Sequence, residues 1–402
     1  MPEVSRATRV VSVDLLRGLV MIIMALDHAR EYFTNLQFPP ELLAQTTGPL
    51  FFTRFITHFC APVFFLLAGT GAFLSVSNGK TVRQVSRFFW TRGLWLVFIE
   101  LTVVDFGWTF IEPFGAASVI WALGWCMVAM ALIVRMPVRW IGAFGVGMIV
   151  LHGLLDRINP ASFGKLSGVW MVLHTPGFYL IKPPDIGAIV LYPLVPWIGV
   201  MAAGYALGAL LVRPDRKKLL LILGASLTVA FFALRAFNHY GNGVAGQSFG
   251  VPLAAGPWSK QPTLSMAVIA FLDTLKYPPS LDYLLMTLGP ALMVLAWFDG
   301  FRSESSIARI LLVYGRVPMF YYVVHIYLIH VMAIAGAWLF HQPAAWLWQG
   351  AIFAAQRPEG YGHGLPFIYL MWFLAVASLY LPCRWFMNFK RRHRDWGWLS
   401  YL

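Results

Sequence analysis

Residues 12–34 read SVDLLRGLVMIIMALDHAREYFT, a stretch apolar enough to cross a membrane that also carries titratable side chains. Ionisable groups inside a spanning helix are costly, so they normally face a bundle interior or a watery cavity and mark a functional path. Arg17 and His28 are eleven residues apart, so they project from nearly the same helical face, about 16 Å apart along the axis. The stretch therefore predicts a first transmembrane helix with functional groups along one face. Its ionisable residues include Asp14, Arg17, Asp27, His28 and Arg30.

The composition of the whole chain indicates a polytopic membrane protein. Of its 402 residues, 59% are hydrophobic and 12% are charged, and the mean hydropathy is +0.69. Soluble domains carry about 25% charged residues. The net charge of +13 would also suit a nucleic-acid-binding protein, but the basic residues form small clusters between apolar segments, as the positive-inside rule describes. We therefore expect a lipid bilayer around the protein and no nucleic-acid partner.

The apolar segments predict one all-α membrane domain over residues 1–402, a bundle of about ten, or eleven, transmembrane helices. The basic clusters fall on one side, which places both termini in the cytoplasm of a multi-pass inner-membrane (plasma-membrane) protein. On the other side we expect long loops at 157–186, 237–280 and 337–364 that roof a substrate site. The predicted spans are 12–34, 50–77, 88–110, 116–134, 138–156, 187–211, 218–236, 281–299, 308–336 and 365–387.

The outer ends of the first two spans predict a cluster of catalytic side chains. Asp27 and His28 lie near the outer end of the first span, and His58 lies two turns inside the second, one turn after Arg54. Consecutive spans are antiparallel, so the four side chains can meet at one depth. An imidazole assisted by a carboxylate can act as a general base. Two alternatives stay open: a helix-end pair solvated at the membrane surface, and a purely structural network.

The segment YGRVPMFYYVVHIYLIH at 314–330 repeats this pattern. Arg316 lies near the inner end, His325 and His330 lie in the middle and outer half, and Tyr322 lies one turn before His325. We expect Tyr322, His325 and His330 to support the cluster, and the alternative is a set of tyrosine-bonded structural histidines.

Two motifs of soluble enzymes are absent from the sequence. It contains no phosphate-binding GxxxxGK[ST] and no zinc-binding HExxH. Scattered histidines leave zinc or a haem between two helices as alternatives, but no pair has convincing ligand spacing. We expect no metal site.

Four segments together resemble the bacterial branch of the heparan-α-glucosaminide N-acetyltransferase-like membrane family, within the wider transmembrane acyltransferase group. They are SVDLLRGLVMIIMALDHAREYF (12–33), FFTRFITHFCAPVFFLLAGTGAFL (51–74), YPPSLDYLLMTLGP (277–290) and YGRVPMFYYVVHIYLIH (314–330). The resemblance implies transfer of an acetyl group from cytosolic acetyl-CoA to an amine or hydroxyl of a sugar or glycoconjugate on the periplasmic side.

The resemblance also implies roles for particular residues. Arg17, Arg92 and Arg316 would hold the phosphates of acetyl-CoA at the cytoplasmic mouth, because arginine suits bidentate phosphate contacts. Asp27 occupies the place of the polar residue that assists the catalytic histidine in lysosomal relatives. The loop at 35–49, which carries that histidine there, has none here, so His28 and His58 are candidates by proximity.

Other functions remain open at this stage. A secondary transporter or flippase could use the same His, Asp and Arg groups as a proton relay, and discontinuous helices in two matching halves would favour it. A non-catalytic partner in envelope polysaccharide synthesis would tolerate loss of His28 and His58. The sequence also leaves a homo-oligomer open, as well as the identity of the acceptor and the length of the acyl donor.

Overall fold

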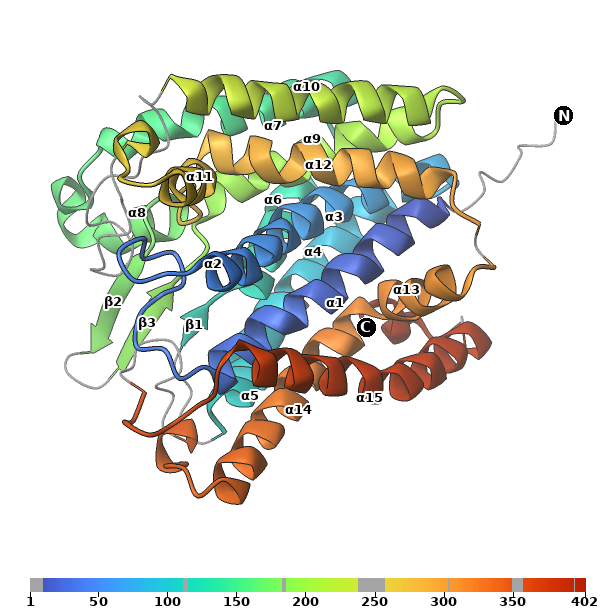
Figure 1. The fold of residues 1–402 in the computed structure, drawn as a ribbon. Coiled ribbons are helices and arrows are strands. Elements are labelled where there is room, and N and C mark those ends of the chain that lie inside the picture. The colour runs from blue at the N-terminus through green and yellow to red at the C-terminus, as the bar shows by residue number, and fades with distance from the viewer. Residues whose placement is uncertain are drawn as a thin grey trace, which may run out of the picture.

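Helix α1 (Val11–Phe33) runs through the middle of a helical bundle, with other helices on both sides of it (Figure 1). The protein is described here by a computed structural model, which covers residues 10–110, 115–182, 186–237, 257–302, 304–348, 357–393 and 395–402. The structure is 77% helical. Because α1 contacts α3, α12, α13, α14 and α15, its charged face can be shared among several partners.

The all-α membrane class is confirmed. In the described part of the chain, seven helical segments are long and apolar enough to cross a membrane. The 23 residues of α1 are also enough to span, since about 20 residues cross the hydrocarbon core. The seven segments are Gly48–Ser77, Val138–Arg157, Leu194–Leu211, Arg216–Ala236, Leu281–Asp299, Pro318–Leu339 and Leu365–Arg392.

The individual helices follow the predicted order with local interruptions. The segment 48–77 consists of α2 (Gly48–Phe55), a 3-10 turn (Ile56–Phe59) and α3 (Cys60–Ser77). Helix α4 (Val82–Ile99) continues through a π-helical turn (Glu100–Val104) into α5 (Asp105–Thr109). The remaining long or packed helices are α6 (Val119–Ile133), α7 (Val138–Leu151), α9 (Leu194–Leu211), α10 (Arg216–Ala236), α11 (Leu264–Leu272), α12 (Leu281–Asp299) and α15 (Leu365–Arg392).

Two predicted spans differ most clearly from the structure. The segment 308–336, expected as one helix, is two: α13 (Ser306–Arg316) and α14 (Pro318–Leu339), which meet at Val317. The residue before a proline is driven out of helical geometry, and Val317 has φ −130° and ψ 49°. The span expected at 187–211 begins only at Leu194, because residues 186–190 form a strand.

A small sheet, absent from the prediction, lies at the end of the bundle where α8 (Ser167–Leu173) and α11 also lie (Figure 1). Its strand order is β1-β3-β2, with β1 (Ala116–Ala117) parallel and β2 (Gly177–Lys182) antiparallel to β3 (Ile186–Val190). The expected outer loops are therefore partly ordered by backbone pairing. The predicted loops at 237–280 and 337–364 include residues 238–256 and 349–356, which lie outside the described residues.

Glycines let α1 and α13 approach until their backbones touch. A Cβ atom added at Gly18 would lie 1.9 Å from the Leu311 carbonyl oxygen, and one added at Gly315 would lie 1.9 Å from the Asp14 carbonyl oxygen. Small residues give membrane helices this close approach, which increases van der Waals contact where lipid provides no hydrophobic driving force. The contact fixes the N-terminal half of α1 against the C-terminal end of α13.

Candidate functional site

The N-terminal half of α1 holds a cluster of charges that the α1–α13 contact brings together. Arg17 Nη1 donates to Asp14 Oδ1 at 3.1 Å and to the Gly315 carbonyl at 3.2 Å. The Nε atom of Arg316 lies 3.8 Å from Asp14 Oδ2. The negative charge of Asp14 thus partly neutralises the charges of Arg17, on the same helix, and of Arg316, at the end of α13.

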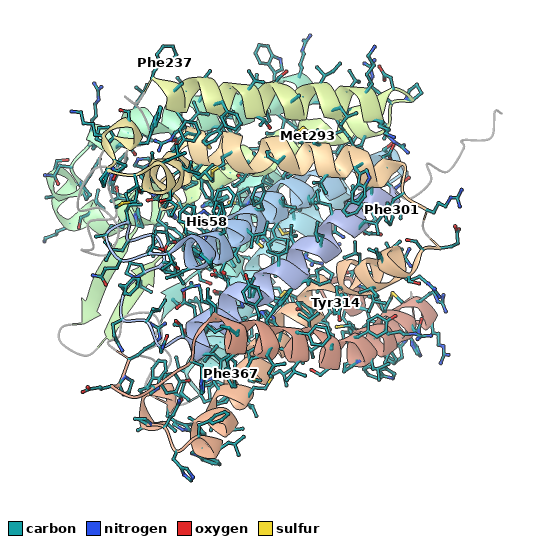
Figure 2. The ribbon with its side chains drawn as sticks, in the orientation of Figure 1. His58, Phe237, Met293, Phe301, Tyr314 and Phe367 are labelled. Atoms are coloured by element: carbon teal, nitrogen blue, oxygen red, sulfur yellow. The ribbon has the colours of Figure 1, made fainter. Side chains whose placement is uncertain are left out.

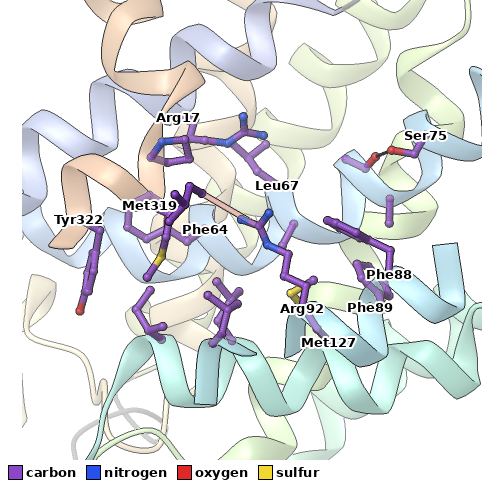
Figure 3. A pocket seen from close by; sticks show the side chains of 18 of the residues that line it. Arg17, Phe64, Leu67, Ser75, Phe88, Phe89, Arg92, Met127, Met319 and Tyr322 are labelled. Carbon is purple, nitrogen blue, oxygen red and sulfur yellow. Dashed lines mark hydrogen bonds between the residues drawn. The ribbon is translucent and has the colours of Figure 1, made fainter. Parts of the chain in front are cut away.

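A cavity of about 350 Å³ opens beside this cluster (Figure 3). One part of its wall is basic, with Arg17, Arg92 and Arg316 joined by Lys80 and Lys390. The rest is largely apolar. This volume is in the range of small-molecule and cofactor sites, and an elongated ligand with an anionic end and an apolar end would match the lining. The other lining residues include Met21, Phe64, Leu67, Phe89, Ile120, Met127, Met319 and Tyr322.

The C-terminal segment contributes to the basic side of this cavity. Leu402 lines it, and Arg92 donates from Nη1 to the Ser400 carbonyl. The Tyr401 hydroxyl lies 2.6 Å from the Thr91 hydroxyl. Arg92 therefore has a neutral backbone partner that an anionic ligand could replace.

His28 and His325 form a direct pair that joins α1 to α14. Nδ1 of His28 lies 2.7 Å from Nε2 of His325, and the two rings are stacked with centroids 4.9 Å apart. Nδ1 of His325 lies 2.9 Å from the Tyr321 carbonyl. Since a carbonyl only accepts, His325 must carry its proton on Nδ1 and, when neutral, presents a lone pair on Nε2. His28 then donates from Nδ1, and its own Nε2 is left with the lone pair.

The histidine pair adjoins the cavity through Tyr322. This tyrosine lines the cavity, and its ring centroid lies 6.3 Å from that of His28 and 5.6 Å from that of His325. Trp108 packs edge-on against His28 with centroids 4.9 Å apart. Tyr322 thus lies both on the wall of the cavity that holds the basic groups and next to the imidazole with a lone pair.

Asp27 lies in a separate charged cluster near the C-terminal end of α1. Its carboxylate accepts from Arg30 at 3.0 Å and from Arg54. Arg54 Nε also donates to Glu41 Oε1 at 2.7 Å. Burial alone would raise the pKa of Glu41, but the charge of Arg54 and the neighbouring His58 imidazole hold that pKa well below its usual range. The cluster is therefore a network of paired charges.

His58 lies at the 3-10 turn between α2 and α3 and is 2% exposed (Figure 2). Its Nε2 is 3.7 Å from Glu41 Oε1, and within the described residues neither ring nitrogen makes a hydrogen bond. Its backbone carbonyl accepts from the Tyr283 hydroxyl at 2.8 Å. The structure thus places Glu41, and not Asp27, beside this imidazole, and it places His28 beside His325.

His330 lies in a third environment. Its ring nitrogens lie 2.9 Å from the Gly107 carbonyl and 2.8 Å from the Leu347 carbonyl. The ring also stacks on Phe110 with centroids 3.9 Å apart. With both nitrogens against backbone carbonyls, His330 ties α14 to neighbouring segments.

Three further charged residues, Glu41, Lys80 and Lys390, lie in these sites without a motif in the sequence that points to them. The two lysines belong to the basic clusters that indicated membrane orientation, and that pattern could have suggested them as additional cavity cations. Glu41 gave no signal, because it lies in a loop outside any motif and meets His58 and Arg54 only in the folded chain.

Comparison with known proteins points to one family. The family model described as "Heparan-alpha-glucosaminide N-acetyltransferase, catalytic" matches residues 9–238, which is more than half of the chain. The matched region contains α1, α3, α4 and α6, which supply much of the cavity wall. No curated protein matches the chain.

Proposed function

Because the chain belongs to the heparan-alpha-glucosaminide N-acetyltransferase family, we propose that it is an acetyl-CoA-dependent acetyltransferase of the inner membrane. The acetyl group passes from cytosolic acetyl-CoA to an amine or hydroxyl of a sugar or glycoconjugate on the periplasmic side. The observation that carries the proposal is the path from a basic, partly apolar cavity to an imidazole whose Nε2 holds a lone pair.

The cavity supplies a matched site for the donor. Arg17, Arg92 and Arg316, with two lysines, line its basic part, where guanidinium groups would bind the CoA phosphates by charge-assisted hydrogen bonds. The apolar lining would hold the pantetheine arm, with the thioester directed toward Tyr322 and His28. The positive-inside pattern of the sequence supports a cytoplasmic position for this basic end.

His28 is assigned the role of general base. As the acceptor amine or hydroxyl attacks the thioester carbonyl, Nε2 of His28 takes its proton, and the C–S bond then breaks to release CoA. General-base assistance of this kind contributes about 10²–10⁴-fold to a rate. The same lone pair would serve as a nucleophile if the acetyl group first moved to the imidazole, and a single-turnover experiment with radiolabelled acetyl-CoA distinguishes the two routes by a labelled protein intermediate.

The charged cluster at the outer end of α1 is assigned to the acceptor. Asp27 and Arg54 are paired, and His58 adjoins Glu41. Their carboxylates and imidazole offer hydrogen-bond partners for the hydroxyl groups of a sugar. His325 supports His28 directly, whereas His330 supports α14 structurally.

The test is a thiol-release assay on the purified, folded protein in nanodiscs, with acetyl-CoA and glucosamine-containing acceptors, alongside direct measurement of CoA binding. We expect CoA binding and acceptor-dependent thiol release. Absence of CoA binding by folded protein would exclude the enzyme, and proton-coupled movement of a sugar or lipid without acetyl transfer would indicate a transporter instead.

A further inference from the structure

The segment that follows α15, residues 396–402, lies against α4 at the basic part of the cavity. Arg92 Nη1 donates to the Ser400 carbonyl, and the Tyr401 hydroxyl lies 2.6 Å from the Thr91 hydroxyl. Arg92 is one of the arginines assigned to the donor phosphates, so the segment occupies a contact that the donor would make. Segment 396–402 is therefore either a permanent part of the cavity wall or a competitor of the donor.

Three consecutive residues of the segment each offer chemistry that matches one part of CoA. The Ser400 carbonyl oxygen accepts a hydrogen bond from a guanidinium, as a phosphate oxygen would. The Tyr401 ring lies against the Phe88 ring, with centroids 5.9 Å apart, and so takes a place that an adenine ring could take. Leu402 presents an apolar side chain to the cavity, as the pantetheine arm would. The segment thus occupies the donor site with groups that resemble the donor.

The aromatic partner of Tyr401 lies between cations. Phe88 lines the cavity, and Lys80 Nζ and Arg92 Cζ lie 5.6 Å and 5.5 Å from its ring centroid. Figure 3 shows Phe88 and Arg92 on the same part of the wall. A nucleotide needs such partners, because bases pack on aromatic rings and phosphates bind cations. Tyr401 therefore covers a surface that suits the nucleotide end of CoA.

The segment is held by few buried contacts. Ser400 is exposed, Trp398 is 55% exposed and Tyr401 is half-buried. Among residues 396–402, all of which the structure describes, Leu399 alone is fully buried. Segments with few buried contacts open at a low free-energy cost, and a guanidinium binds a phosphate more strongly than a neutral carbonyl. Both points favour displacement of the segment by the donor.

We propose that segment 396–402 is an autoinhibitory element that occupies the donor site in the absence of acetyl-CoA and leaves it when acetyl-CoA binds. This inference rests on the proposed function, because it assigns the segment to the same cavity. The donor binds only those molecules in which the segment has moved away, so the apparent Kd exceeds the intrinsic Kd by the inverse of their fraction. Weakening the segment therefore tightens donor binding, whereas weakening a permanent wall would loosen it.

The first experiment measures the Kd of CoA by isothermal titration calorimetry on the full chain in nanodiscs. Tyr401→Ala removes the ring and hydroxyl contacts, so we expect CoA to bind about tenfold more tightly than to wild type. Thr91→Val removes only the hydroxyl partner of Tyr401, and we expect binding about threefold tighter. Thr91 is not one of the described residues that line the cavity, so this change leaves the donor site itself intact.

Trp398→Ala is the matched control within the same segment. The Trp398 ring is 55% exposed and packs on Trp396, with centroids 6.2 Å apart. Because this ring lies on the exposed side of the segment, its loss should leave the Kd of CoA within about twofold of the wild-type value.

Hydrogen exchange follows the segment itself. Residues Gly397–Ser400 form a 3-10 turn, in which the Leu399 and Tyr401 N–H groups each donate to a backbone carbonyl at 3.0 Å. So short a helical turn is not stable in water without packing. Saturating CoA should therefore raise deuterium uptake by residues 396–402 of wild type to the level of CoA-free Tyr401→Ala.

The outcomes separate the inference from the proposed function. Equal Kd values for wild type and Tyr401→Ala, weaker CoA binding by Tyr401→Ala or Thr91→Val, or unchanged deuterium uptake on addition of CoA would overturn the inference. In each of these cases wild type still binds CoA, so the proposed function stands. If no folded variant and no wild-type protein binds CoA, the proposed function fails, and the inference fails with it.

Discussion

Replacement of His325 with leucine is the sharpest test of how the histidine pair works. The change removes the Nε2 acceptor that lies 2.7 Å from His28 Nδ1 and leaves an apolar side chain in its place. His28 then keeps a buried N–H without its partner, or shifts its proton to Nε2. Both results reduce the population with a free lone pair on Nε2, so we expect slower transfer with little change in donor binding.

The expected decrease in kcat follows from the loss of one buried hydrogen bond. A buried donor left without an acceptor costs about 1–3 kcal/mol, and 1.36 kcal/mol corresponds to a tenfold change in rate. His325→Leu should therefore lower kcat by about 5-fold to 150-fold. His28→Ala removes the base itself and should lower kcat by about 10²–10⁴-fold. His325→Gln offers an amide oxygen to His28 Nδ1 and should restore part of the lost rate.

The assay is steady-state thiol release in nanodiscs at saturating acceptor, with KM for acetyl-CoA and Tm measured for each variant. Equal rates for His325→Leu and His325→Gln would refute the tautomer reasoning, since only the glutamine can accept a hydrogen bond. A nearly unchanged kcat in folded His28→Ala would refute the assignment of the base. In that case His58, beside Glu41, would be the next imidazole to test.

Three further predictions address the rest of the molecule. Arg92→Ala should raise KM for acetyl-CoA about tenfold or more with kcat within threefold, because a charged contact to phosphate is lost and the Ser400 carbonyl is not an anion; an unchanged KM would place the phosphates elsewhere. Since the pKa of Glu41 is depressed in the folded protein, its stabilising effect is present above the unfolded value of about 4.3 and is lost at lower pH. The Tm difference between wild type and Glu41→Gln should thus shrink as pH falls from 6 to 3, and a constant difference would contradict the ion pairing. Gly18→Ala puts a Cβ atom 1.9 Å from a carbonyl oxygen, 1.5 Å short of ordinary contact at 3.4 Å, so this variant should have a Tm several degrees lower than wild type. Gly147→Ala is the control, because its added Cβ has no atom within 4 Å and should leave Tm unchanged. Equal Tm values for the two variants would mean that α13 can move away from α1 at no cost.

The all-α membrane class could be predicted because composition and long apolar segments reflect the bilayer directly. The break between α13 and α14 could in principle be predicted, because Pro318 disfavours helical backbone angles at Val317. Proline is nevertheless common inside transmembrane helices and does not by itself indicate two separate helices. The three strands lie in segments without alternating polarity, and their pairing depends on residues 116–117 and 186–190 meeting across the fold.

The candidate site was predictable only along single helices. Spacing along α1 placed Arg17 and His28 on one face, and the structure puts Arg17 on the cavity wall and His28 beside His325. No local rule connects His28 with a residue 297 positions later, because helix packing decides which faces meet. For the same reason the approach of Glu41 to His58 could not be foreseen.

The charges of α1 also have a consequence for the order in which the protein is made. His28 pairs with His325 and Arg17 bonds to Gly315, so these partners emerge from the ribosome about 300 residues later, a delay of about 15–60 s at 5–20 residues per second. Within α1, however, Arg17 pairs with Asp14 and Arg30 pairs with Asp27, each at a spacing of three. These ion pairs within α1 neutralise the charges of Arg17 and Arg30 as soon as the helix forms. The helix can therefore stay in the membrane before the later helices are synthesised and pack against it.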